Sequence, residues 1–183
     1  KEVDALRKMC ELNGIRSLVE RSRSGKGAHV WIFFKKAIPA ATARNFGFLL
    51  LDKGSTSINL KSFHYYDRMY PSQDVASSIG NLIALPLQGQ ALKNGNSAFV
   101  DENWNAYPDQ WDALFNKTRK LGIEDIEQCM AKWQRELAEV RGLLTNSEKN
   151  VRPKPWKKKC EFCKLDVVGK LHMVLGNGVY VDT

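Results

Sequence analysis

The spacing of apolar residues along the chain predicts a mixture of helices and strands. Apolar positions three and four residues apart predict helices, at 2–13, 39–52, 109–120 and 123–144. Short apolar or alternating runs predict strands, at 15–20, 28–34, 63–69, 81–87 and 97–100. Together these elements predict an α+β fold.

Glycine and proline mark where several of these elements should begin and end. Pro39 lies at the start of the second helix and Gly54 just past its predicted end, which is the usual placement of these residue types. Towards the end of the chain, Gly176-Asn177-Gly178 is a turn signal. We therefore expect a small hairpin over 170–182.

Pattern and composition also predict how the chain is divided into parts. The predicted helix at 123–144 extends a core made by the elements before it, and the stretch after that helix carries Pro153, Pro155 and three consecutive lysines, which is typical of a linker. The predicted parts are a core at 1–120, a helical extension at 121–145, a basic linker at 146–164, and the start of a following β-containing segment at 165–183.

Charge changes this picture by pointing to an anionic partner. The 183 residues carry a formal net charge of +8 and have a pI near 9.4, a balance typical of proteins that bind nucleic acid. Between Lys149 and Lys170 there are eight Lys or Arg and two acidic residues. Such a run is more often a solvated linker, but beside aromatic side chains it can also contact phosphates; the candidates are Lys157, Lys158 and Lys159.

Cysteine usage and hydropathy favour an intracellular, cytoplasmic setting. No apolar run approaches the length of a membrane span, no signal peptide is visible, and the four cysteines form no disulfide framework. Cys160 and Cys163 form a Cys-x-x-Cys pair, and His172 could be a third ligand. Because a structural zinc site needs four ligands, we do not expect zinc there.

A basic turn between two predicted strands is the strongest chemical signal in the chain. Gly25 and Gly27 allow a close backbone approach and leave amide N–H groups for a ligand, and His29 opens the strand that follows the turn. No acidic residue occurs from 21 to 36. The combination suits a polyphosphate, and the alternative is a surface hairpin with a hydrogen-bonded histidine. Positive charge comes from Arg21, Arg23 and Lys26.

A carboxylate at the end of a later strand is the second signal. Asp67 follows an aromatic run, and a carboxylate there needs a cation or a metal as its partner. The neighbouring Arg68 is the alternative partner. Asp74 is predicted to be a turn or helix-cap residue.

These stretches resemble one family of enzymes in order and spacing. Ser24-Gly-Lys-Gly-Ala-His29 resembles the serine–histidine motif of the archaeo-eukaryotic primase superfamily, the primase-polymerases, and Asp67 after Tyr66 resembles its hydrophobic–Asp motif. Three further stretches are similar, more narrowly, to the primase domain of the TOTE conflict systems of bacteria and phages, and the resemblance covers roughly 1–115. These stretches are 66–74, 80–89 and 96–101.

The resemblance implies a fold and an activity. The expected fold is an RRM-like mixed sheet with flanking helices. The expected activity is metal-dependent transfer of nucleotides from an NTP or dNTP to a primer or initiating nucleotide, on a single-stranded DNA or RNA template. The expected partners also include helicase and nuclease domains of the same protein or operon, and no membrane.

The resemblance also assigns roles to residues of this chain. Asp67 and His29 are the predicted catalytic residues, Asp67 being a ligand of Mg²⁺ or Mn²⁺ and His29 a contact of the triphosphate. The lysine run at 157–159, singled out by its charge and not by the resemblance, is the predicted nucleic-acid contact. The whole predicted nucleotide-binding set is Ser24, Gly25, Lys26, Gly27, His29, Arg21, Arg23, Arg68 and Asn81.

One motif of the superfamily is missing from its expected place. An Asp-x-Asp strand, which supplies two metal ligands, should precede the serine–histidine motif, but the chain begins with a predicted helix. We therefore expect a fragment whose first strand lies outside it. Two alternatives remain: a non-catalytic single-stranded nucleic-acid-binding module with a truncated primase fold, and an unrelated phosphohydrolase or nuclease that uses the same turn and Asp67.

Overall fold

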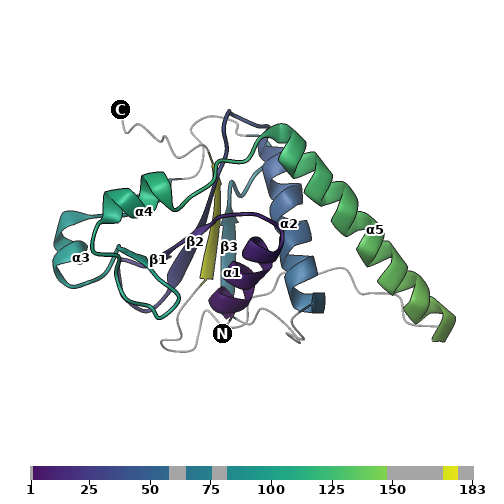
Figure 1. Cartoon of the computed structure of the whole chain (residues 1–183), viewed down its shortest axis with the longest axis horizontal. Helices are drawn as coiled ribbons and strands as arrows, with labels where there is room; N and C mark the ends of the chain where they lie inside the picture. Colours follow the sequence, from purple (N-terminus) through teal and green to yellow (C-terminus); the bar gives the residue numbers. More distant parts are fainter. Residues whose placement is uncertain (1, 58–64, 76–81, 148–170, 177–183) are drawn as a thin grey trace.

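A computed structural model describes residues 2–57, 65–75, 82–147 and 171–176 (Figure 1). The helices and strands follow one another along the chain in a mixed α+β order. They are α1 (Glu2–Leu12), β1 (Leu18–Arg21), β2 (Ala28–Phe33), α2 (Ala40–Ser57), β3 (Tyr66–Tyr70), α3 (Gly89–Lys93), β4 (Phe99–Val100), α4 (Gln110–Asn116), α5 (Ile123–Ser147) and β5 (Leu171–Gly176).

The strands form one mixed sheet in the order β3-β5-β2-β1-β4. β1 runs antiparallel to both β2 and β4, whereas β5 lies parallel to β2 and β3. The register places Phe99, Glu20, His29, His172 and Arg68 on one row across the sheet. Since residues on such a row share a face of a sheet, Phe99, Glu20 and Arg68 lie on the face that carries His29.

Helices α1, α2 and α5 cover one face of the sheet, and α3 and α4 lie on the other side (Figure 1). The larger core lies on the first face, where inward residues of β1 and β2 meet the helices. The side chains of this core are almost completely buried. They include Val19, Val30, Ile32, Leu6, Phe46, Leu50 and Trp133.

A second, smaller core lies on the opposite face of the same strands. It combines alternate residues of β1 and β2 with β4 and α4, and its buried members are Leu18, Trp31, Phe33, Phe99 and Ala113. Apolar residues therefore occur on both faces of β2, which explains why its sequence is a nearly continuous apolar run. His29 is the position of β2 that is only partly buried.

Helix α5, which overlaps the helical extension predicted at 121–145, packs into the larger core. Trp133 of α5 is fully buried and stacks on Phe46 of α2 with ring centroids 5.4 Å apart. Its Nε1 donates to Asn13 Oδ1 at 3.0 Å. One continuous hydrophobic core thus spans both sides of the predicted boundary at 120.

Most predicted elements are confirmed, with small changes at their ends. Helices occur at all four predicted places, as α1, α2, α4 and α5, and strands occur at four of the five, as β1 to β4. Helix α2 continues through Gly54 to Ser57, beyond its predicted end. The short helix α3 was not predicted, since five residues are too few for a helical period to be visible.

One predicted strand is absent. Residues 82–87 form no strand: Pro86 has no N–H to pair, Leu87 has a φ of 64°, and Leu82 is 85% exposed. Residues 171–176, the first part of the predicted hairpin, form a strand that lies parallel to β2 and β3 in the main sheet. The remainder of that predicted hairpin, 177–182, lies outside the described residues.

Candidate functional site

The turn that joins β1 to β2 is closed by its own hydrogen bonds. The Ser22 amide donates to Gly27 O and the Gly25 amide donates to Ser22 O, both at 2.9 Å. The Gly27 amide donates to Ser22 Oγ at 3.0 Å, and the Lys26 amide donates to Ser24 Oγ at 3.3 Å. The amides of Gly25 and Gly27, expected to be free for a ligand, are therefore used within the turn. The side chains of Ser24 and Lys26 are exposed.

Gly25 is required by the backbone at this position. Its φ is +75°, and a Cβ added there would lie 2.7 Å from Asn96 Oδ1. The left-handed conformation makes any other residue strained here, and a Cβ would also require the Asn96 side chain to shift. The turn is thus shaped by the loop that carries Asn96 as well as by its own sequence.

Gly25→Ala is expected to lower the free energy of unfolding by about 1–3 kcal/mol, because alanine would be strained at this φ and would push against Asn96. Urea denaturation of the purified chain measures the change. Gly89→Ala is the matched control, since a Cβ at Gly89 meets nothing within 4 Å. Equal effects of the two substitutions would contradict this view of the turn.

His29 is held by a carboxylate that the sequence did not single out. Glu20 lies directly opposite His29 in the β1–β2 pairing and is 1% exposed. Its Oε2 lies 2.9 Å from His29 Nδ1 and accepts from Trp31 Nε1 at 2.8 Å, and its Oε1 accepts from Ser97 Oγ at 3.1 Å. The His29 side chain keeps 12% exposure. The sequence did contain a signal for this pair. Glu20 is an acidic residue at the end of an apolar strand, and the turn between the two strands sets a register that places it opposite His29.

Ser97 connects this pair to the loop around 87–97. Its oxygen Oγ accepts from the Gln88 amide at 3.2 Å, and its carbonyl accepts from the Leu87 amide at 2.7 Å. Ser97 is almost fully buried and has a φ of 54°. The carboxylate of Glu20 therefore joins the two strands to the loop that faces the turn.

Asp67 lies at an irregular point of β3. The pairing of β3 with β5 shifts between Tyr66 and Arg68, so Asp67 is an extra residue in the ladder, and such bulges re-aim side chains. Its Oδ2 lies 3.2 Å from Arg68 Nε, and its side chain is 14% exposed. The ion pair that was the alternative to a metal role is thus present.

Arg68 lies on the same row of the sheet as His29, two strands away. At the usual spacing of strands, this corresponds to about 10 Å between backbones. A hydrogen bond with Tyr70 and the charge of Asp67 raise the pKa of Arg68 above its usual value, so the guanidinium stays charged. Its side chain is 53% exposed. The row therefore brings a permanent cation to the same face of the sheet as His29.

The other predicted anion ligands lie in different surroundings. The guanidinium of Arg21 donates to Gly95 O and Trp104 O, which gives it a structural role between two loops. Arg23 is exposed at the turn. Asp74 forms an ion pair with Arg44 of α2 at 2.6 Å. The predicted contacts Asn81 and the lysines at 157–159 lie outside the described residues, as does the pair of Cys160 and Cys163, where no zinc is expected.

The described residues do not make up a two-metal site. Among them there is no group of three or more His, Cys, Asp or Glu side chains that could hold a metal ion. Asp67 offers carboxylate oxygens of the kind that Mg²⁺ prefers, but Glu20 lies on β1, separated from β3 by two strands of the sheet, and its carboxylate already contacts three side chains. We therefore derive no reaction step through a metal from these residues.

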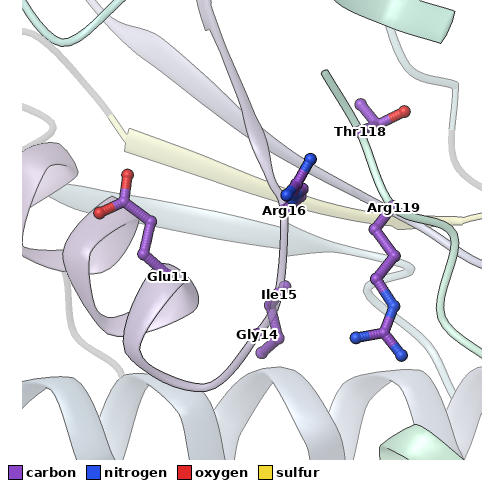
Figure 2. A pocket seen from close by; sticks show the side chains of 6 residues that line it. All are labelled: Glu11, Gly14, Ile15, Arg16, Thr118 and Arg119. Atoms are coloured by element: carbon purple, nitrogen blue, oxygen red, sulfur yellow. The ribbon is translucent and has the colours of Figure 1, made fainter. Parts of the chain in front are cut away.

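A separate cavity of about 640 Å³ lies at the opposite end of β1 from the turn (Figure 2). Its lining combines acidic and basic groups: Glu11, Gly14, Ile15, Arg16, Thr118 and Arg119. Arg119 is paired with Asp125 at 2.8 Å. Since the nearby charges are balanced and none of the motif residues line it, this cavity is distinct from the site at His29.

Comparison with known proteins agrees with the motifs. None of the described helices is long and apolar enough to cross a membrane. No curated protein and no solved structure gave a significant match. A family model described as "TOTE conflict system, Archaeo-Eukaryotic Primase domain" matches residues 1–129, well over half of the chain. The chain therefore belongs to the archaeo-eukaryotic primase domain family of TOTE conflict systems.

Proposed function

We propose that this chain binds the triphosphate of a nucleotide at the turn and His29, and that it serves nucleotidyl transfer of the primase-polymerase type. The observation that supports this most is His29 itself, held by the buried Glu20 at the foot of a turn whose Ser24 and Lys26 are exposed. Histidine and lysine side chains beside a tight turn make charge-assisted contacts to phosphate oxygens. Family membership makes a nucleoside triphosphate the expected ligand.

In this reaction a hydroxyl of a primer or initiating nucleotide attacks the α-phosphate. A new P–O bond forms and the hydroxyl gives up its proton to solvent, while the bond between the α-phosphorus and the α,β-bridging oxygen breaks and pyrophosphate leaves with that electron pair. Bound divalent ions would neutralise the negative charge on the leaving pyrophosphate. Ser24, Lys26 and His29 would hold the triphosphate, and the guanidinium of Arg68, on the same face of the sheet, would attract it.

Titration of the chain with a fluorescent nucleoside triphosphate, followed by an assay for incorporation on a primed template, tests the proposal. Saturable binding that strengthens with Mn²⁺ is the expected result, and template-dependent extension is expected only where the metal ligands that the described residues lack are supplied. Release of inorganic phosphate or cleaved strands without extension would favour a phosphohydrolase or nuclease instead.

Asp67→Asn distinguishes a metal role from the ion pair with Arg68. Without metal, we expect this substitution to strengthen nucleotide binding about two- to fivefold, because it removes a negative charge and releases Arg68 for the phosphates. In Asp67→Asn, we expect Mn²⁺ no longer to strengthen nucleotide binding, as it should in the unmodified chain. Asp74→Asn, at an exposed acid paired with Arg44, is the control. Retention of the full Mn²⁺ effect in Asp67→Asn would rule out Asp67 as a metal ligand.

A second candidate function, binding of single-stranded nucleic acid without catalysis, is favoured by an exposed aromatic pair on α4. Trp111 and Phe115 are 60% and 69% exposed, and their rings stack with centroids 6.0 Å apart and planes at 16°. The basic residues Lys117, Arg119 and Lys120 follow directly in the chain. Aromatic faces next to cations are the usual platform for unpaired bases and their phosphates.

Trp111→Ala is expected to weaken binding of a labelled oligothymidylate by roughly five- to 150-fold, since stacking of a base on an aromatic ring contributes about 1–3 kcal/mol. Fluorescence anisotropy at constant salt measures it, because phosphate contacts make the affinity salt-dependent. Leu82→Ala, at a side chain that is 85% exposed, is the control. Equal affinities for all three proteins would exclude α4 as a base-stacking surface.

A further inference from the structure

Glu20 is buried, and its carboxylate contacts three other side chains. It is 1% exposed and receives three side-chain groups, from His29, Trp31 and Ser97. Burying a carboxylate is costly unless hydrogen bonds replace its lost water. The three partners meet this requirement and also fix the position of both oxygen atoms.

The partners of Glu20 differ in what they can do. Trp31 Nε1 can only donate, so Oε2 must accept from it and is thereby fixed as an acceptor. His29 Nδ1 lies 2.9 Å from that same oxygen, which matches a proton on Nδ1. The ring of His29 also packs edge-on to Trp31, with centroids 6.5 Å apart and planes at 82°.

We infer that Glu20 is a positioning residue, which fixes the orientation and the Nδ1–H tautomer of His29 and so aims Nε2 away from the carboxylate, towards the ligand of the turn. This inference rests on the proposed nucleotide site, but its first test does not. A group that hydrogen-bonds to one ring nitrogen of a histidine fixes the orientation of the ring, and so decides which nitrogen contacts the ligand. Glu20 acts on the nucleotide only through His29.

The tautomer of His29 is the direct test, by ¹⁵N NMR of the imidazole at pH 8.5, where an ordinary histidine is neutral. The unmodified chain should carry its proton on Nδ1. Glu20→Ala should shift the ring towards the Nε2–H form that free histidine prefers, and Glu20→Gln, whose amide oxygen can still accept, should restore Nδ1–H. A proton on Nε2 in the unmodified chain would overturn the inference, even if Glu20→Ala failed to fold.

Nucleotide affinity provides the second test, in a double-mutant cycle. Glu20→Ala should weaken binding of a fluorescent nucleoside triphosphate by about as much as His29→Ala, roughly tenfold, and the double variant should be no weaker than His29→Ala. Additive losses would show that Glu20 does not act through His29. Circular dichroism verifies that each variant is folded.

Two controls separate positioning from general damage to the core. Trp31→Phe and Ser97→Ala each remove another donor to Glu20 but leave its pair with His29, so both should keep the Nδ1–H tautomer. If the tautomer is as expected but His29→Ala binds nucleotide normally, the proposed function fails while the positioning role stands. If the tautomer is unchanged in Glu20→Ala, the positioning role fails by itself.

Discussion

His29→Ala is expected to weaken binding of a nucleoside triphosphate at least tenfold, or about 1.4 kcal/mol. The imidazole is 12% exposed and is fixed by Glu20, so little conformational entropy is lost when it meets a ligand. Hydrogen bonds between a charged group and a neutral or charged partner contribute about 1.5–3 kcal/mol. Loss of one such bond to a phosphate accounts for the expected change.

Fluorescence anisotropy of a labelled nucleotide, with and without Mn²⁺, measures the affinity and so tests this prediction. Two lysine variants provide a matched comparison, because Lys26 and Lys93 are both exposed but only Lys26 lies in the turn. Lys26→Ala should weaken binding, whereas Lys93→Ala should leave it nearly unchanged. An unaltered affinity in His29→Ala would place the nucleotide elsewhere.

Trp133→Ala is expected to lower the free energy of unfolding by about 3–5 kcal/mol, the usual cost of truncating a buried aromatic residue. The side chain is fully buried in the core beneath the sheet and stacks on Phe46. Its loss would also leave Asn13 Oδ1 without the donor it has now, which adds a polar penalty.

Urea or thermal denaturation measures this effect, with Gln134→Ala as the control. Gln134 is the next residue of α5 and is exposed, so its substitution should change stability by less than about 0.5 kcal/mol. A small effect of Trp133→Ala would contradict the packing of α5 into the larger core.

Local patterns were enough to predict the four longer helices, α1, α2, α4 and α5, and the β1–β2 hairpin. The apolar run of β2 and the glycine-bearing turn before it are signals contained within a few residues. The position of β5 could not be predicted in this way. Its parallel pairing with β2 and β3 joins segments far apart in the sequence, and no local pattern specifies such a partner.

The candidate site was predictable only in part, for a similar reason. Ser24, His29 and Asp67 were predicted as site residues because each lies in a recognisable motif. Glu20 was missed because its role depends on the register that places it opposite His29. Until that register is known, nothing distinguishes it from any other glutamate in a strand. Likewise, the carbonyl partners of Arg21 are 74 and 83 residues away, so sequence alone could not show its structural role.

Mapping the bound nucleotide by NMR tests the central claim most directly. The backbone amides of the ¹⁵N-labelled chain would be followed while a non-hydrolysable nucleoside triphosphate is added. We expect the largest shifts at 22–29 and at Ser97, whose hydroxyl contacts Glu20. Shifts confined to the cavity lined by Arg16 and Arg119, with none in the turn, would contradict the proposed site.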